Sequence, residues 1–284
     1  MIHKKVNFTN DGRVYMNTYF LDYYKQKYYK KGKWQPEKRP VFLILPGGGY
    51  GFQSDREAEP IAMAFNARGL HCAVLYYSVL EYSSMPNPLE DVSKAIWYLR
   101  KHAEEFHINP NAVIVGGFSA GGNLSSIIGT QWDTPGLAEK LNIPRRGNRP
   151  DALMLAYAPT ELIYEPENTY GTDTSAYGNP EEPRGILLAE KSDALNTAKR
   201  VNRDTPPAFI WQTSQDQIIS PHNALAYADA CYRNHVECEL HVFQYGLHGT
   251  ALANDVTDYK AEKDINVETW VPMFMNWIRK QFHY

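Results

Sequence analysis

The sequence has few cysteines, no excess of basic residues and no long hydrophobic run. Its three cysteines are scattered over 284 residues without a CxxC pair, so neither a disulfide framework nor a zinc site is indicated. The formal net charge is −3, so the chain lacks the excess of basic residues that is typical of nucleic-acid-binding proteins. No apolar run is long enough to span a membrane, and no secretory signal is apparent. We therefore expect a cytoplasmic protein with reduced thiols and no nucleic-acid or membrane partner.

What the sequence does contain is an alternation of apolar strands with amphipathic helices. Strand, helix and strand at this spacing predict an α/β protein with a mostly parallel sheet and helices on both faces. One or two antiparallel strands within residues 13–29 are expected to precede it, and we expect one domain over residues 1–284. The predicted strands are 41–45, 71–79, 113–118, 152–157, 208–213 and 239–243; the predicted helices are 57–68, 89–106, 223–235 and one from about 271.

Residues 159–207 interrupt this alternation. The segment is long, irregular and rich in Pro, Glu, Thr and Tyr. Stretches of this length without periodicity are usually functional loops or lids, and otherwise disordered. We expect a lid or cap inserted into the domain.

A serine stands between the predicted strand at 113–118 and a helical pattern. It lies in Gly117-x-Ser119-x-Gly121, where small residues flank Ser119 on both sides. A serine on a tight turn from strand to helix is held above the sheet edge, beside the N–H groups of the helix N-terminus. The alternative is an ordinary glycine-rich turn. The context favours Ser119 as a nucleophile.

A serine hydroxyl is a weak nucleophile until a base, usually a neutral histidine, removes its proton. Of nine histidines, His248 lies on a Gly-flanked loop after the last predicted strand. Loops beyond the carboxyl ends of parallel strands carry the reactive groups of such sheets. We therefore predict His248 as the base.

The carboxylate that orients the histidine is expected between Ser119 and His248 in chain order. Asp216 follows the predicted strand 208–213 and fits this position. Its alternative role is that of a turn aspartate. Glu181 and Asp193 are weaker candidates, because neither follows a strand.

Acyl transfer also requires hydrogen-bond donors for the developing oxyanion. The predicted strand 41–45 ends in Pro46 and three glycines. We expect Gly48 and Gly49, with Ala120 after the serine, to supply backbone N–H groups. The alternatives are a flexible turn or a weak phosphate loop, but no Walker-type Lys-Ser/Thr follows.

These motifs together resemble the α/β-hydrolase fold. The order PGGGY, GFSAGG, SQDQ and YGLHG is similar to that of esterases related to hormone-sensitive lipase, and most similar to acetyl esterases and acetylxylan-esterase-like enzymes. Further likenesses are the segments 54–60 (SDREAEP), 88–92 and 206–211. One departure is that lipase-type relatives carry His-Gly-Gly-Gly where this chain has Pro46 before its glycines, which weakens a lipase interpretation.

The resemblance implies a serine carboxylesterase. Ser119 is expected to attack an ester carbonyl, His248 to act as base and then acid, and Asp216 to orient His248. No metal or organic cofactor is required. The expected substrate is a short-chain, chiefly acetyl, ester of a sugar or oligosaccharide.

Aromatic residues are the only indication of the substrate surface. Tyr50, Tyr157 and Tyr177 could stack on a sugar or aryl group, together with Tyr164, Tyr170 and Trp211. The alternative is ordinary packing, which is favoured for Trp211 because it falls within a predicted strand.

Two other functions stay open at this point. One is a serine peptidase on the same fold, although no amine-anchoring glutamate motif or added propeller is evident. The other is a non-catalytic binding protein, a class that typically lacks a triad member. A homodimer is compatible with the sequence but not required by it.

Overall fold

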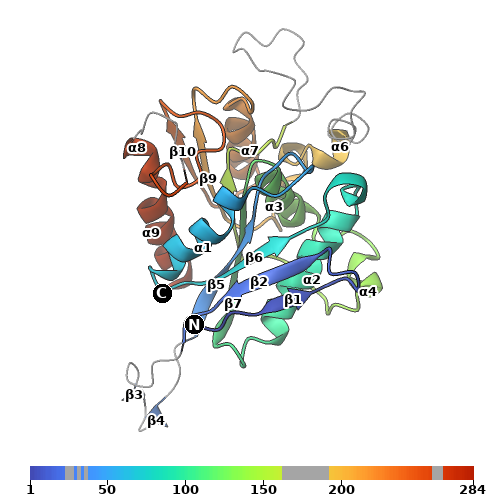
Figure 1. Cartoon of the computed structure of the whole chain (residues 1–284). Helices are drawn as coiled ribbons and strands as arrows, with labels where there is room; N and C mark the ends of the chain where they lie inside the picture. Colours follow the sequence, from blue (N-terminus) through green and yellow to red (C-terminus); the bar gives the residue numbers. More distant parts are fainter. Residues whose placement is uncertain (23–28, 31–32, 35–37, 162–191, 258–264) are drawn as a thin grey trace.

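The computed structural model describes residues 1–22, 29–30, 33–34, 38–161, 192–257 and 265–284. The described residues surround one eight-stranded sheet with the order β1-β2-β6-β5-β7-β8-β9-β10 (Figure 1). The strands are β1 (Lys5–Asn7), β2 (Tyr15–Tyr19), β5 (Arg39–Leu45), β6 (His71–Tyr76), β7 (Ile108–Phe118), β8 (Ala152–Ala156), β9 (Ala208–Thr213) and β10 (Cys238–Phe243).

The six strands from β6 to β10 in this order are parallel, and β2 pairs antiparallel with both β1 and β6. A separate pair is formed by β3 (Tyr29–Lys30) and β4 (Lys33–Trp34). The predicted mostly parallel sheet is therefore confirmed. One antiparallel strand expected within residues 13–29 is β2.

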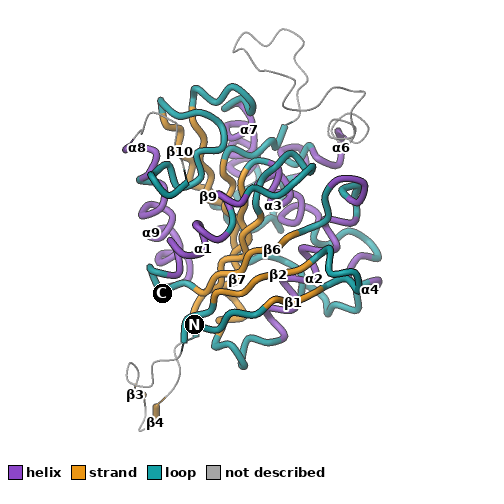
Figure 2. The backbone as a smooth tube through the Cα atoms, in the orientation of Figure 1, coloured by secondary structure: helices purple, strands orange, loops and turns teal. Residues whose placement is uncertain are grey.

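Helices cover both faces of the sheet (Figure 2). One face packs against α1 (Glu59–Asn66) and α9 (Trp270–Phe282), and the other against α2 (Asn87–Lys101), α3 (Ala120–Gln131) and α7 (His222–Arg233). The shorter elements are α4 (Leu137–Lys140), α6 (Ser192–Leu195), α8 (Ile265–Glu268), η1 (Asp55–Glu57), η2 (Leu80–Tyr82) and η4 (Ala198–Arg200).

Strand β5 shows why the central strands read as continuous apolar runs. Phe42 and Ile44 belong to the core under α1 and α9, whereas Leu43 and Leu45 belong to the core under α2 and α3. All four side chains are fully buried. Because successive side chains point to opposite faces, a strand covered on both sides has no polar position. Burying each such side chain stabilises the fold by roughly 1.5–3 kcal/mol.

Element boundaries differ modestly from those that the sequence predicts. The helix expected at 57–68 begins two residues later, after the 3-10 turn η1, and the helix expected at 89–106 occupies Asn87–Lys101. Strand β1 has no clear sequence signal, because it is three residues long and its Lys5 and Asn7 are exposed. It forms by pairing with β2.

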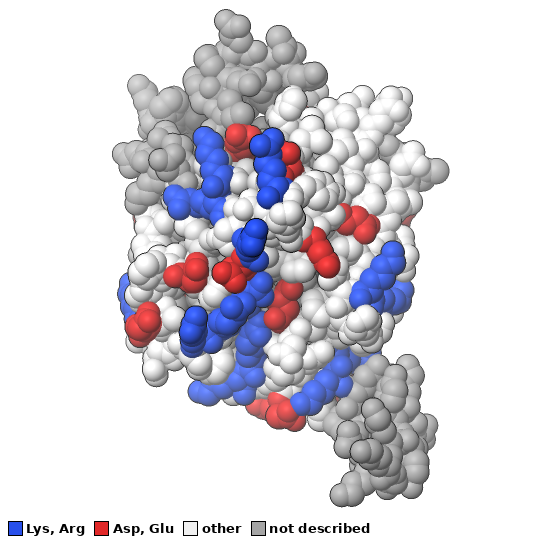
Figure 3. Space-filling model, turned by 180° about the vertical axis from the view of Figure 1, so that it is seen from behind, with Lys and Arg blue, Asp and Glu red and all other residues white. Residues whose placement is uncertain are grey.

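The predicted insertion at 159–207 falls largely outside the described residues. Its described C-terminal part, 192–207, contains α6 and η4. The face of the molecule seen in Figure 3 carries Lys and Arg side chains intermixed with Asp and Glu. Within the described part of the chain, no helix has both the length and the apolar character needed to cross a bilayer.

Candidate active site

Five neighbouring strands carry the site at their carboxyl ends. Strands β5, β7, β8, β9 and β10 lie side by side in this order in the sheet. They lead, respectively, into the loops that hold Gly48, Ser119, Tyr157, Asp216 and His248. Because parallel strands end at one edge, residues far apart in sequence come together there.

Ser119 occupies the turn between β7 and α3. Its backbone angles, φ 51° and ψ −119°, are ones that residues other than glycine rarely adopt. The turn is tight because α3 packs directly on β5. A Cβ added to Gly121 would lie 2.0 Å from the Leu45 carbonyl oxygen. The small residues around the serine are therefore required by close backbone approach, as its motif predicts.

The structure brings Ser119, His248 and Asp216 into one hydrogen-bonded row. His248 Nε2 lies 2.9 Å from Ser119 Oγ, and His248 Nδ1 lies 2.7 Å from Asp216 Oδ2. A proton on Nδ1 is donated to the carboxylate, which leaves Nε2 free to accept the serine proton. The arrangement can therefore deprotonate Ser119 as it attacks.

Asp216 is fixed by more than its bond to the histidine. Its Oδ1 accepts the backbone N–H groups of Ile218 and Ile219 at 2.9 and 2.8 Å. Its Oδ2 also accepts the side-chain amide of Gln212 at 3.2 Å. The Asp216 side chain is fully buried, and four hydrogen bonds hold its carboxylate. Asp216 therefore stabilises the turn through Oδ1 and binds His248 through Oδ2, so the two roles considered for it are compatible.

The glycine loop after β5 lies beside Ser119. A Cβ added to Gly47 would be 3.0 Å from Ser119 Cβ, so the glycine turn contacts the serine. The N–H of Gly47 is already donated to Glu57. Among the described residues, no acceptor is found for the N–H groups of Gly48, Gly49 or Ala120. Their role as donors to an oxyanion stays a prediction.

Glu57 is a site residue that sequence reasoning did not assign. Its side chain is 3% exposed, and it accepts the Gly47 N–H at 2.8 Å and the Tyr157 hydroxyl at 2.6 Å. Burial raises the pKa of the Glu57 carboxyl, and these two hydrogen bonds oppose the increase. The signal that could have found it is the SDREAEP segment at 54–60.

The predicted stacking tyrosines occupy other roles where they are described. Tyr50 is 4% exposed and donates its hydroxyl to Asn123 Oδ1, and Tyr157 is 1% exposed and donates to Glu57. Such burial does not fit a surface on which a sugar stacks, which corrects that assignment. Tyr177, Tyr164 and Tyr170 lie outside the described residues. Trp211 is fully buried, as the packing alternative predicts.

Asn123, on the first turn of α3, binds two described parts of the 159–207 segment. Its side-chain amide donates to the Pro159 carbonyl at 2.6 Å and to the Leu195 carbonyl at 3.0 Å. Its carbonyl oxygen accepts from Tyr50. Pro159 and Leu195 are therefore both held at the first turn of α3, which follows Ser119.

A serine hydroxyl, an imidazole and a buried carboxylate in one hydrogen-bonded row form an arrangement that suits acyl transfer. In the part of the chain that the structure describes, no cluster of three or more His, Cys, Asp or Glu side chains is placed to bind a metal ion.

Known proteins of similar sequence include esterases, xylan-degrading enzymes and polyketide synthases. The BD-FAE family model matches residues 27–230. Endo-1,4-beta-xylanase B of Butyrivibrio fibrisolvens is 32% identical over 228 residues, covering 77% of this chain and 33% of that protein. Acetylxylan esterase of Xylanibacter ruminicola is 27% identical over 250 residues, covering 86% of this chain and 45% of that protein. The chain thus spans less than half the length of these relatives.

Solved structures match over nearly the whole chain. The carboxylesterase Cest-2923 from Lactobacillus plantarum has a TM-score of 0.83 and 25% identity, with 99% of this chain and 98% of that one covered. An acetyl ester-xyloside bifunctional hydrolase from Caldicellulosiruptor lactoaceticus has a TM-score of 0.73 and 26% identity, with 98% and 96% covered. The predicted α/β-hydrolase fold is confirmed, and the chain belongs to the BD-FAE family of esterase-like α/β-hydrolases.

Proposed function

We propose that this chain is a serine carboxylesterase that hydrolyses short acyl esters, chiefly acetyl esters of sugars or oligosaccharides. The observation that carries the proposal is the hydrogen-bonded row from Ser119 through His248 to Asp216. A serine of this geometry has a base within reach of its proton, and that base is held by a buried carboxylate. Both features are needed for acyl transfer at neutral pH.

In the first half-reaction, Ser119 Oγ bonds to the ester carbonyl carbon as its proton passes to His248 Nε2. The carbonyl oxygen becomes an oxyanion, which accepts N–H groups from Gly48, Gly49 and Ala120. Each such donor is worth roughly 3–4 kcal/mol of barrier in comparable systems. When the intermediate collapses, the bond to the alcohol oxygen breaks, and the His248 proton passes to that oxygen.

In the second half-reaction, water replaces the alcohol. His248 removes a proton from the water as its oxygen attacks the acyl carbon, and the same amides hold the second oxyanion. The bond to Ser119 Oγ then breaks, the proton returns to the serine, and the carboxylic acid leaves. Asp216 stabilises the imidazolium in both halves without taking its proton.

The preference for acetylated sugars draws support from relatives. The relatives include an acetylxylan esterase and an acetyl ester-xyloside bifunctional hydrolase. The Pro46-glycine sequence in place of a lipase-type His-glycine sequence also argues against long acyl chains. We further propose a cytoplasmic location, supported by the free thiols of Cys72, Cys231 and Cys238; a homodimer remains a prediction.

Hydrolysis of p-nitrophenyl acetate by wild type and Ser119→Ala tests the reaction. We expect the variant to fold and to lose activity to background. Ser125→Ala is the matched control, because it removes another serine hydroxyl of α3, one that donates to the Gly121 carbonyl. Full activity in Ser119→Ala would overturn the proposal.

A substrate panel tests the specificity. We expect acetylated xylo-oligosaccharides to be deacetylated, and kcat/KM on p-nitrophenyl esters to fall as the acyl chain lengthens. Aminoacyl anilides serve as the peptidase arm, on which we expect no turnover. Faster cleavage of anilides than of acetyl esters would replace the esterase assignment with a peptidase assignment.

A further inference from the structure

The short helix η1 lies between two loops of the active site. Residues 54–60, which contain it, belong to the motif set shared with the esterase family, yet none of them is needed for the acyl-transfer steps above. Of the three residues of η1, only Glu57 is buried. A buried acid that no reaction step uses has to be explained by what it contacts.

Glu57 contacts the glycine loop through one oxygen and Tyr157 through the other. Oε2 accepts the Gly47 N–H at 2.8 Å, and Oε1 accepts the Tyr157 hydroxyl at 2.6 Å. Both oxygens of the carboxylate therefore receive a donor, the arrangement that suits an ionised acid. Gly47 immediately precedes the proposed oxyanion donors Gly48 and Gly49.

Tyr157 carries the connection to the histidine loop. Its hydroxyl oxygen accepts the N–H of Ala251 at 3.2 Å, three residues beyond His248. Its ring packs edge-on against the His248 ring, with centroids 5.0 Å apart. A continuous buried chain thus runs from the Gly47 amide through Glu57 and Tyr157 to the Ala251 amide.

Arg56 holds the same histidine loop from outside. Its guanidinium donates to the Thr257 carbonyl at 3.0 Å, and a Cβ added to Gly249 would lie 3.4 Å from it. Arg56 therefore contacts the 248–257 loop directly, whereas Glu57 reaches it through the Tyr157 hydroxyl. Only Glu57 also reaches the glycine loop.

We infer that Glu57 is a positioning residue that couples the oxyanion loop to the His248 loop and holds a negative charge behind the catalytic histidine. The inference rests on the proposed esterase function and explains a residue outside the triad. When His248 is protonated during the reaction, Glu57 and Asp216 both favour that charge, one at a distance and one by direct hydrogen bond.

The charged and titratable groups around Glu57 come from four segments. Arg56 lies on η1 itself, Tyr157 follows β8, His248 follows β10, and Tyr77 follows β6; each interacts electrostatically with the Glu57 carboxylate. Arg56 and a protonated His248 favour the ionised form of Glu57.

Glu57→Gln is the main test, because it removes the charge while keeping an oxygen for the Gly47 N–H. We expect kcat on p-nitrophenyl acetate to fall on the order of 10- to 100-fold with KM little changed. The acid limb of the kcat/KM profile is expected to move to lower pH, because the protonated histidine loses a neighbouring negative charge. Glu57→Ala is expected to lose more activity than Glu57→Gln.

Asp151→Asn is the control for loss of a partly buried, hydrogen-bonded carboxylate. Asp151 accepts the Val113 N–H at 2.9 Å and pairs with Arg100, at the opposite end of β8 from the site. We expect it to lower the Tm but to leave kcat and the pH profile unchanged. A kcat loss in both variants that simply follows their Tm would overturn the inference.

Tyr157→Phe provides a second test of the coupling through Glu57. Because Tyr157 and Glu57 act as one chain, we expect the double variant with Glu57→Gln to be little slower than the slower single variant. If Glu57→Gln does not fold, wild-type kcat in Tyr157→Phe overturns the inference. A folded Glu57→Gln with wild-type kcat and pH profile also overturns it, even where Ser119→Ala is inactive and the esterase function stands.

Discussion

His248 Nε2 lies 2.9 Å from Ser119 Oγ, although the two residues are 129 positions apart in the sequence. Nothing local holds them together, because Ser119 follows β7 and His248 follows β10. Their contact depends on the order of β7, β8, β9 and β10 in the sheet and on the loops after each strand. Variants that change one residue of this row therefore test both the arrangement of the strand ends and the proposed proton transfer.

Asp216→Asn should abolish most activity while leaving the fold intact. The amide would present an N–H group to His248 Nδ1 and favour the tautomer with its proton on the wrong nitrogen. We expect kcat to fall on the order of 10³- to 10⁴-fold, as in serine proteases with the equivalent change. Asp229→Asn, an exposed change on α7, is the control. A loss of less than about tenfold would argue against the role of Asp216.

Substitutions at Gly48 and Gly49 should differ in severity. Gly48 has φ +127°, and a Cβ there would lie 2.2 Å from the Phe52 carbonyl oxygen. Gly49 has φ +60°, and a Cβ there would meet nothing within 4 Å. We expect Gly49→Ala to cost about 1–2 kcal/mol of stability, and Gly48→Ala to shift the loop and lower kcat roughly 10²-fold. Equal kcat values in the two variants would contradict this account of the loop.

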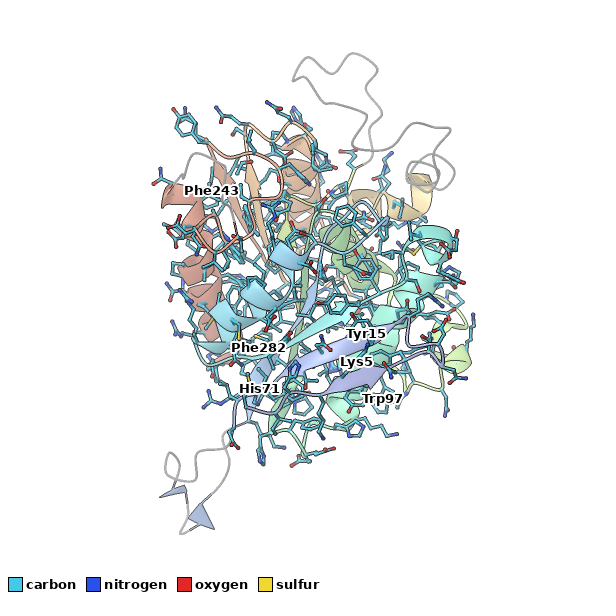
Figure 4. All side chains as sticks on the ribbon, viewed as in Figure 1. Lys5, Tyr15, His71, Trp97, Phe243 and Phe282 are labelled. Carbon is cyan, nitrogen blue, oxygen red and sulfur yellow. The ribbon has the colours of Figure 1, made fainter. Side chains whose placement is uncertain are left out.

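His71 should make the protein sensitive to acid. This side chain lies at the start of β6 (Figure 4), and burial, with nearby Arg39 and His107, lowers its pKa from 6.5 to about 4. The unfolded chain binds the proton below about pH 6.5, but the folded chain does so only below about pH 4. Protonation of His71 therefore does not affect the free energy of unfolding above pH 6.5. As the pH falls from 6.5 to about 4, the unfolded chain takes up the proton first, and the free energy of unfolding decreases by on the order of 3 kcal/mol.

Urea unfolding at pH 7 and at pH 4.5 measures this effect. His71→Asn keeps an acceptor for the Leu21 N–H, which His71 Nδ1 accepts at 3.0 Å. We expect it to lose less stability than wild type on acidification, whereas the exposed change His235→Asn should follow wild type. Parallel losses in wild type and His71→Asn would refute the assignment.

Asn123→Ala should destabilise the protein by leaving buried groups unpaired. The Tyr50 hydroxyl and the carbonyls of Pro159 and Leu195 all bond to the Asn123 side chain, which is fully buried. We expect a loss on the order of 3 kcal/mol in urea unfolding. Asn276→Ala, on the exposed side of α9, should change stability by less than about 0.5 kcal/mol. Similar values for the two variants would be the contrary result.

The hydrogen-bonded row of Ser119, His248 and Asp216 could be predicted because each member leaves a local signal. Ser119 lies in a glycine-rich turn between a strand and a helix, and His248 and Asp216 each follow an apolar strand. In a parallel sheet these positions share one edge, so the strand pattern alone brings the loops together. The same pattern predicted that both faces of β5 are covered, which the burial of Phe42 and Leu43 confirms.

The supporting residues could not be predicted, because their roles depend on burial. A tyrosine next to a site looks the same in sequence whether its ring faces solvent or packs inward. The burial of Tyr157 and its bond to Glu57 join residues 100 positions apart. In the sequence, Glu57 is an ordinary acidic residue in a polar turn. Only the fold shows that its carboxylate accepts the Gly47 N–H.

Labelling with a fluorophosphonate, followed by peptide mass spectrometry, tests the central claim most directly. The reagent reacts with a serine only when a base and an oxyanion site activate its hydroxyl. We predict a single adduct on Ser119 in wild type, none in Ser119→Ala and strongly slowed labelling in His248→Ala. An unlabelled wild-type protein, or an adduct on another residue, would contradict the account.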